Sequence, residues 1–251
     1  MTIIVRLTHA ELRRLVAARS FLIGLALSAG LAIISVAVDA AVAGKNGAPA
    51  LGSTASTDRM LKLGSVCCVA MLVLGLIGSG SEYRHKTIIP AMLVTPRRGS
   101  LVAAKVIGIA VAGVLLSVLT FGLGLATVVA ELSAHGFHHL PADTGTLFAG
   151  SVIASTLFGV IGAALGYITR STIAAIVGAV GWVLFAELAI LHTVAPHLAK
   201  WLITGAASTL TDPGVLASRA LTPATAVAVL SGYAAVLLAT ASWLVLRRDV
   251  A

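Results

Sequence analysis

The chain of 251 residues is 59% hydrophobic and only 10% charged, and it carries a formal net charge of +8. Charged residues make up about a quarter of soluble domains, so this composition excludes that class and indicates a multi-span membrane protein, as does the mean hydropathy of +1.05. The basic residues stand at the ends of apolar segments. This distribution favours a membrane surface, and not nucleic acid, as the partner of the positive charge.

The first predicted element is a basic amphipathic helix over residues 1–19. Its apolar and basic residues fall on different sides at helical spacing; they are Val5, Leu12, Leu15 and Val16, and Arg6, Arg13 and Arg14. We expect the helix to lie flat on the inner membrane surface, with its arginines near lipid phosphates. Two roles remain open, which are anchoring of the N-terminus and contact with a cytoplasmic partner.

Six apolar runs follow, and each approaches or exceeds the length of about 20 residues needed to cross a bilayer. They cover residues 20–43, 63–80, 101–130, 146–168, 173–191 and 224–246. The first run is long and lacks a small-residue cleavage pattern, so we expect it to remain as a span and not to be removed as a signal peptide. The predicted fold is therefore all-α, with six transmembrane helices in one domain covering residues 1–251.

The distribution of Lys and Arg predicts the orientation of these spans. Twelve of these residues fall at one set of span ends and five at the other. Because basic loops are retained on the cytoplasmic side, both termini are predicted to be cytoplasmic.

Small residues predict close helix packing inside the bundle. Small residues at three- or four-residue spacing occur in the third and fourth runs, at Gly122 and Ala126 and at Gly159, Ala163 and Gly166. The adjacent Cys67 and Cys68 lie in an apolar run, where neighbouring side chains diverge. We interpret both cysteines as small buried hydrophobic residues.

The connection between the second and third runs is unusually basic. Residues 81–105 read SEYRHKTIIPAMLVTPRRGSLVAAK. Thr87 can cap a short helix, Pro90 is tolerated in its first turn, and Pro96 ends it, which leaves roughly two turns. One interpretation is an interfacial loop that follows the positive-inside rule. The other is a rigid helix that contacts a cytoplasmic partner.

The motif in this connection resembles that of the ABC type-2 permeases, the membrane subunits of ATP-binding-cassette exporters. The residues that carry the resemblance are E82-Y-R-H-K-T, L93-V-T-P-R-R and the lysine at position 105. The predicted layout is also similar to that family, with an amphipathic helix, six spans, cytoplasmic termini and a long outer connection before the last span. Lys86 stands where the family usually has Gly, and Pro90 lies inside the short helix.

The resemblance implies that residues 82–98 form a coupling helix, which seats in a groove of a separate ATPase subunit. The matched positions at or near that joint are Glu82, Arg84, Thr87, Pro96, Arg97, Arg98 and Lys105. It also implies a second permease subunit, either a copy or a relative, and re-entrant helices over residues 192–223. Cofactors are expected only in the partner subunit, as ATP and Mg, because this sequence contains no G-x-x-x-x-G-K-[ST] motif.

Glu187 lies within the fifth run, where an ionisable group is costly unless it faces protein or water. A role in the pathway or between subunits and a structural role both remain open. Three outer histidines at 135, 138 and 139 are close in sequence, but a solvated loop explains them better than a metal site. No zinc-protease or nucleophile-elbow motif is present, which disfavours an intramembrane enzyme.

The expected function is that of a non-enzymatic permease subunit in a bacterial inner membrane. It would export a drug, an antibiotic or a lipid-like amphiphile, driven by the partner ATPase. The alternative is a secondary carrier or channel that works without ATP. That class usually places several polar groups at the midplane, where this sequence offers Glu187 alone.

Overall fold

The computed structural model describes residues 2–45, 47–84, 98–137, 144–169, 171–183, 198–212 and 221–247. Within these ranges every regular element is a helix, which confirms the predicted all-α class for this part of the chain. Five of the described helices are long and apolar enough to cross a membrane. They are α2 (Arg19–Val42), α4 (Gly64–Arg84), α6 (Arg98–Ala134), α7 (Thr144–Thr169) and α11 (Pro223–Arg247). This architecture is that of a multi-pass membrane protein.

The fifth predicted span, over residues 173–191, is described only in part. Its first turns form α8 (Thr172–Gly181), which begins after Ser171, whose hydroxyl accepts a hydrogen bond from the Ala174 amide. At ten residues α8 is about 15 Å long, half the thickness of the hydrocarbon layer. Residues 184–191 of this predicted span lie outside the described residues.

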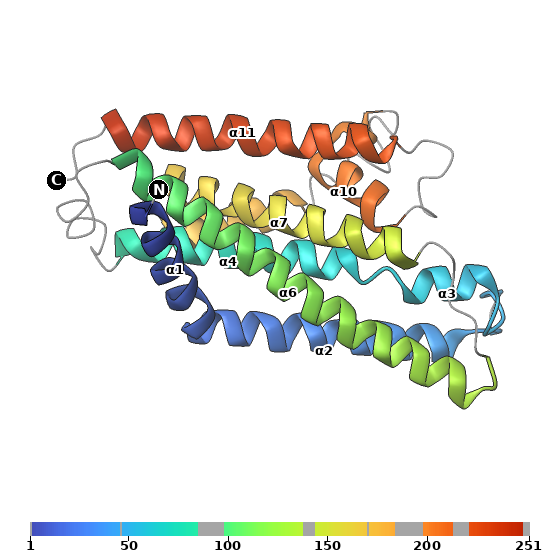
Figure 1. Cartoon of the computed structure of the whole chain (residues 1–251). Helices are drawn as coiled ribbons and strands as arrows, with labels where there is room; N and C mark the ends of the chain where they lie inside the picture. The colour runs from blue at the N-terminus through green and yellow to red at the C-terminus, as the bar shows by residue number, and fades with distance from the viewer. Residues whose placement is uncertain are drawn as a thin grey trace.

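The remaining described elements cover the two ends of the bundle (Figure 1). Helix α1 (Thr2–Ala17) lies across the end at which α2 and α6 begin. The short helices α3 (Thr54–Met60) and α10 (Ile203–Thr211), with the 3-10 turn η3 (Ala199–Trp201), lie away from α1 along the bundle. Helices α4 and α11 also end where α1 lies, so the ends predicted to be cytoplasmic gather on one side.

Helix α6 is longer than the predicted span of 101–130. At 37 residues it is about 55 Å long, well beyond the roughly 30 Å of hydrocarbon. The apolar run of residues 101–130 is itself about 45 Å long, so the helix has to tilt to hold it in the membrane, and it continues through polar residues at both ends. It ends before Gly136, whose φ of 81° breaks the helical path.

Helices α4 and α7 form the most extensive contact of the bundle, and glycines bring them together. A Cβ added at Gly75 would overlap the Gly159 carbonyl oxygen, and one added at Gly162 would overlap the Leu72 carbonyl oxygen. The predicted packing role of the small residues around Gly159 is therefore confirmed. Cys67 and Cys68 of α4 are free and buried, as predicted.

The same prediction is wrong for the small residues of α6. Within this chain, Gly122 has open space where a side chain would be, and Ala126 is exposed. Glycines of α6 that lie against other parts of the bundle include Gly113, against Thr156 of α7, and Gly124, against Leu63 of the α3–α4 junction. Two residues along a helix rotate a side chain by about 200°, so the spacing was recognised on the wrong face.

Candidate functional site

Helix α1 packs on the transmembrane bundle through the apolar stripe predicted from the sequence. Leu12, Leu15 and Val16 contact a buried cluster that includes Met71 of α4 and Ile109 of α6. Amphipathicity predicted a helix lying flat on the membrane surface. The structure places its apolar side against protein.

Helix α1 comes within van der Waals reach of one glycine on α4 and one on α6. A Cβ added at Gly78 of α4 would lie 3.4 Å from a Leu15 methyl carbon, and one added at Gly108 of α6 would lie 3.4 Å from the Glu11 Cβ. Helix α1 therefore packs mainly on α6 and touches α4 near Gly78, and these are the two long helices that flank the basic connection at residues 85–97.

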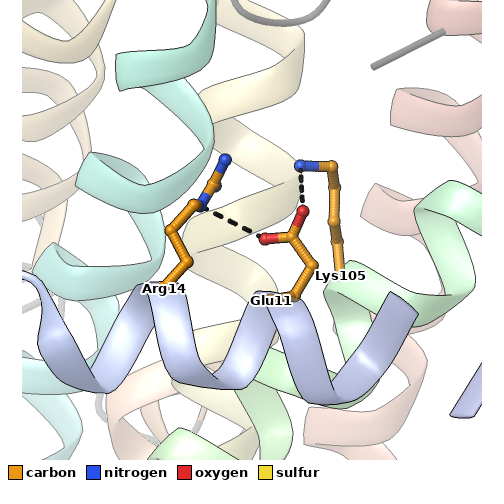
Figure 2. Close-up of polar contacts among 3 residues, drawn as sticks. All are labelled: Glu11, Arg14 and Lys105. Atoms are coloured by element: carbon orange, nitrogen blue, oxygen red, sulfur yellow. Dashed lines mark hydrogen bonds and ion pairs between the residues drawn. The ribbon is translucent and has the colours of Figure 1, made fainter. Parts of the chain in front are cut away.

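An ion-pair cluster joins α1 to α6 (Figure 2). The Lys105 Nζ donates a hydrogen bond to Glu11 Oε1 at 3.1 Å, and the Arg14 Nε lies 3.3 Å from Glu11 Oε2. Figure 2 shows the carboxylate of Glu11 between the two cations, with one oxygen turned to each. The side chain of Lys105 is 6% exposed, that of Glu11 14%, and that of Arg14 47%.

These exposures separate a structural pair from a surface pair. An ammonium group removed from water loses several kcal/mol of hydration, which a nearby carboxylate must offset. Lys105 is in that situation, and Glu11 supplies the carboxylate. The contact of Arg14 is half exposed, so it contributes about 1 kcal/mol or less.

The cluster lies close along the chain to the segment predicted to couple. Lys105 follows Arg98, the first residue of α6, by two helical turns, or about 10 Å. Glu82 and Arg84 lie in the last turn of α4. Their side chains and that of Arg98 are outside the described part, and the predicted Thr87, Pro96 and Arg97 lie outside the described residues altogether.

Glu187, the residue predicted to serve a pathway or subunit contact, also lies outside the described residues, as do His138 and His139. The neighbouring His135 is described, and its Nδ1 lies 2.9 Å from the Glu131 carbonyl oxygen. In the described ranges, no three His, Cys, Asp or Glu side chains gather closely enough to hold a metal ion.

At the opposite end of the bundle, α10 occupies part of the region predicted to be re-entrant. Lys62 and Asp212 form an ion pair at 2.9 Å that joins the start of α4 to the end of α10. The Tyr233 hydroxyl donates to the Trp201 carbonyl oxygen at 3.2 Å, which joins η3 to α11. Helix α10, with nine residues, is too short to cross the bilayer.

Glu11 is the residue of this cluster that the sequence reasoning missed. It is the sole acidic residue among the first 38 residues, and Lys105 is the sole charged residue between Arg98 and Glu131. A lone acid in a basic helix and a lone lysine in an apolar span each need a partner in a poorly hydrated place. That shared need is a signal for their pairing.

No protein-family model matches this sequence, and no curated protein matches it. The likeness to ABC type-2 permeases therefore depends on the motif in residues 82–105 and on the arrangement of the helices.

Proposed function

We propose that this chain is the membrane-spanning subunit of an ABC exporter in a bacterial inner membrane. It works with a separate ATPase subunit and a second permease subunit, and it moves an amphiphilic compound, either a drug or a lipid-like molecule, outward. ATP and Mg would be held by the ATPase subunit. In this arrangement the termini are cytoplasmic, and residues 82–98 contact the ATPase.

The observation that carries the proposal is the packing of the two helices that flank the motif-bearing connection. Residues 85–97 join α4 and α6; α6 packs closely on α1, and α4 meets α1 near Gly78, at the end of the bundle where α6 begins. A connection held in this way can pass a displacement to several spans. A connection between loosely placed helices would absorb it.

The ion pair supports a mechanical role for this end of the bundle. A force on residues 82–98 reaches Arg98, and from there it passes along α6, which is one continuous helix. At Lys105 the helix is fixed to Glu11, so α1 and the start of α6 move together. We propose that closure of the ATPase subunits rotates this unit and thereby changes the packing of the spans.

The exposed surface of the helices is compatible with a second membrane subunit. Helix α2 leaves large apolar side chains such as Leu22, Leu31 and Val38 more than half exposed. In a bilayer such a face contacts lipid or another membrane helix. The proposal includes a homodimer and a related heterodimer as the two possible assemblies.

The test begins with a tagged chain purified from native membranes in mild detergent. We expect an ATP-hydrolysing subunit to co-purify with it, and ATP turnover to rise when vesicles containing the complex receive a transported compound from a panel of amphiphilic drugs and lipids. The variants Glu82→Ala and Arg84→Ala should lower this stimulated turnover while membrane insertion stays unchanged. Lys200→Gln, at the other end of the bundle, is the control and should leave the turnover unchanged.

Two results would contradict the proposal. The first is a complex without any ATP-hydrolysing subunit, in which an ion gradient alone drives transport; this favours the secondary carrier. The second is stimulated turnover that is the same in the Glu82 and Arg84 variants as in the native complex. That result reduces the connection to a topological anchor.

A further inference from the structure

A long apolar groove runs between α2 and α4 on the surface of the bundle. Helix α2 packs mainly on α6 and less closely on α4, which leaves a space of about 670 Å³ between them. Its walls are almost entirely hydrocarbon, with Ile23, Leu27, Val69 and Val73 among the lining side chains. This volume falls in the range of small-molecule and cofactor sites, about 300–1,000 Å³.

The groove has the depth of a single membrane leaflet. Along α2 it extends from Ser20 to Leu31, a rise of about 17 Å, against about 15 Å for half of the hydrocarbon layer. The shallow end of the groove, meaning the end closest to the membrane surface, reaches the corner where α1 meets α2. Ser20 and Leu74 line both the groove and a small adjoining space that Leu15 of α1 closes.

A positive charge with no ion-pair partner among the described residues stands next to this end of the groove. Arg19, Ile23, Leu27 and Leu31 follow one another on α2 at four-residue spacing, so they form one stripe along the helix. The three apolar members line the groove, and Arg19 lies one turn before Ile23 and directly before Ser20, the first α2 residue of the lining. The arginine is exposed, and it forms no ion pair with a described residue.

We propose that the groove binds one anionic phospholipid from the leaflet next to α1, with an acyl chain between α2 and α4 and the phosphate at Arg19. The hydrocarbon walls extend over the depth of one leaflet and match an acyl chain. The guanidinium of Arg19, which has no ion-pair partner among the described residues, matches the lipid phosphate. The proposal requires only that α2 and α4 span a bilayer, so it stands apart from the exporter function.

Charge favours a lipid over a second copy of this chain as the occupant. A helix from another copy would have to bring an acid to Arg19. Among the described side chains at this end of the bundle, the acidic one is Glu11, and its two oxygens already face Lys105 and Arg14. A lipid phosphate supplies the negative charge without breaking that cluster.

The experiment uses the full-length chain in phosphatidylcholine vesicles that contain a trace of a lipid with a photoreactive group in mid-chain. Phosphatidylglycerol and phosphatidylcholine probes with identical chains are compared, and the labelled peptides are mapped. We expect the phosphatidylglycerol probe to label the groove-facing residues of α2 and α4 preferentially. Arg19→Gln should lower this labelling about fivefold, the effect of one basic residue at a membrane surface, while Arg19→Lys should preserve it.

Matched variants separate the groove from the general surface. Arg13→Gln removes an exposed arginine of α1 that lies off the stripe, and it should change the labelling by less than about twofold. Leu27→Trp fills the groove and should abolish labelling there. Leu22→Trp replaces a similarly exposed leucine of α2 that does not line the groove, and it should leave labelling intact.

Three outcomes would overturn the inference. Equal labelling of the groove by both probes means that no headgroup is recognised. Equal losses in the Arg13 and Arg19 variants mean that only surface charge acts. Absence of lipid from the groove, together with disulfide cross-linking between Leu27→Cys chains, means that a second copy occupies it. Each outcome is obtained without any ATPase, so none of them decides whether an ATPase subunit drives transport.

Discussion

Breaking the Glu11–Lys105 pair tests whether α1 is a structural part of the bundle. Glu11→Gln keeps the shape of the side chain and removes the charge that faces Lys105, whose side chain is almost completely buried. Removing one partner of a buried pair costs about 3–5 kcal/mol. Because the amide of glutamine can still accept a hydrogen bond and Glu11 itself is partly exposed, we expect about 2–3 kcal/mol.

The reverse variant should cost less. Lys105→Met leaves a carboxylate that Arg14 still contacts, and methionine fills most of the lysine stem with apolar atoms. We expect a loss of about 1–2 kcal/mol. The double variant leaves neither charge in the protein interior, and hydrophobic replacement of a buried pair is often neutral, so it should recover to within about 1 kcal/mol of the native chain.

The assay is equilibrium unfolding in mixed micelles, followed by the fluorescence of the three tryptophans. The double-mutant cycle then gives the coupling between the two positions, which we expect to be roughly 3–4 kcal/mol from the three losses above. Additive losses, with a coupling below about 0.5 kcal/mol, would refute the reasoning, because they would mean that the two side chains do not depend on each other.

Three further predictions address other parts of the molecule. Gly162→Ala should destabilise the fold by about 1–3 kcal/mol in the same assay, since the new methyl group overlaps the carbonyl oxygen of α4, whereas Gly122→Ala should be neutral or stabilising. Lys62→Met, which breaks the partly exposed pair with Asp212, should cost about 1 kcal/mol and should raise proteolysis at the end of the bundle where α3 and α10 lie. A Ser100→Cys variant should react with a membrane-impermeant thiol reagent only from the cytoplasmic side; reaction from outside would reverse the orientation.

The long helices could be predicted from the sequence because membrane-spanning length is a property of one uninterrupted segment. Four of the predicted runs correspond to α2, α4, α6 and α7, and the last corresponds to α11. What a single segment does not encode is how far a helix extends beyond the hydrocarbon. Helix α6 illustrates this, since its polar ends remain helical outside the apolar run.

Contacts between helices were harder to predict, because they depend on how each helix is rotated about its axis. The spacing of Gly122 and Ala126 satisfies the small-residue rule, yet Gly124, between them, is the glycine that faces the bundle. Glu11 and Lys105 are 94 positions apart, and nothing in either local pattern reports that α1 crosses α6 at that point. The periodicity gave the correct buried side of α1, at Leu12 and Leu15, but not the helix that covers it.

The structure also changes how the basic residues of this end should be weighed. Sequence counting treats Arg19 and Lys105 alike, as charges that hold a loop on one side of the membrane. In the fold they are in opposite situations, because Lys105 is buried against Glu11 while Arg19 is exposed with no ion-pair partner among the described residues. An internally neutralised lysine contributes little to attraction by anionic lipids, since the field of its partner cancels most of its own. Binding of anionic lipid should therefore weaken when Arg19 is neutralised and stay nearly unchanged when Glu11 and Lys105 are replaced together.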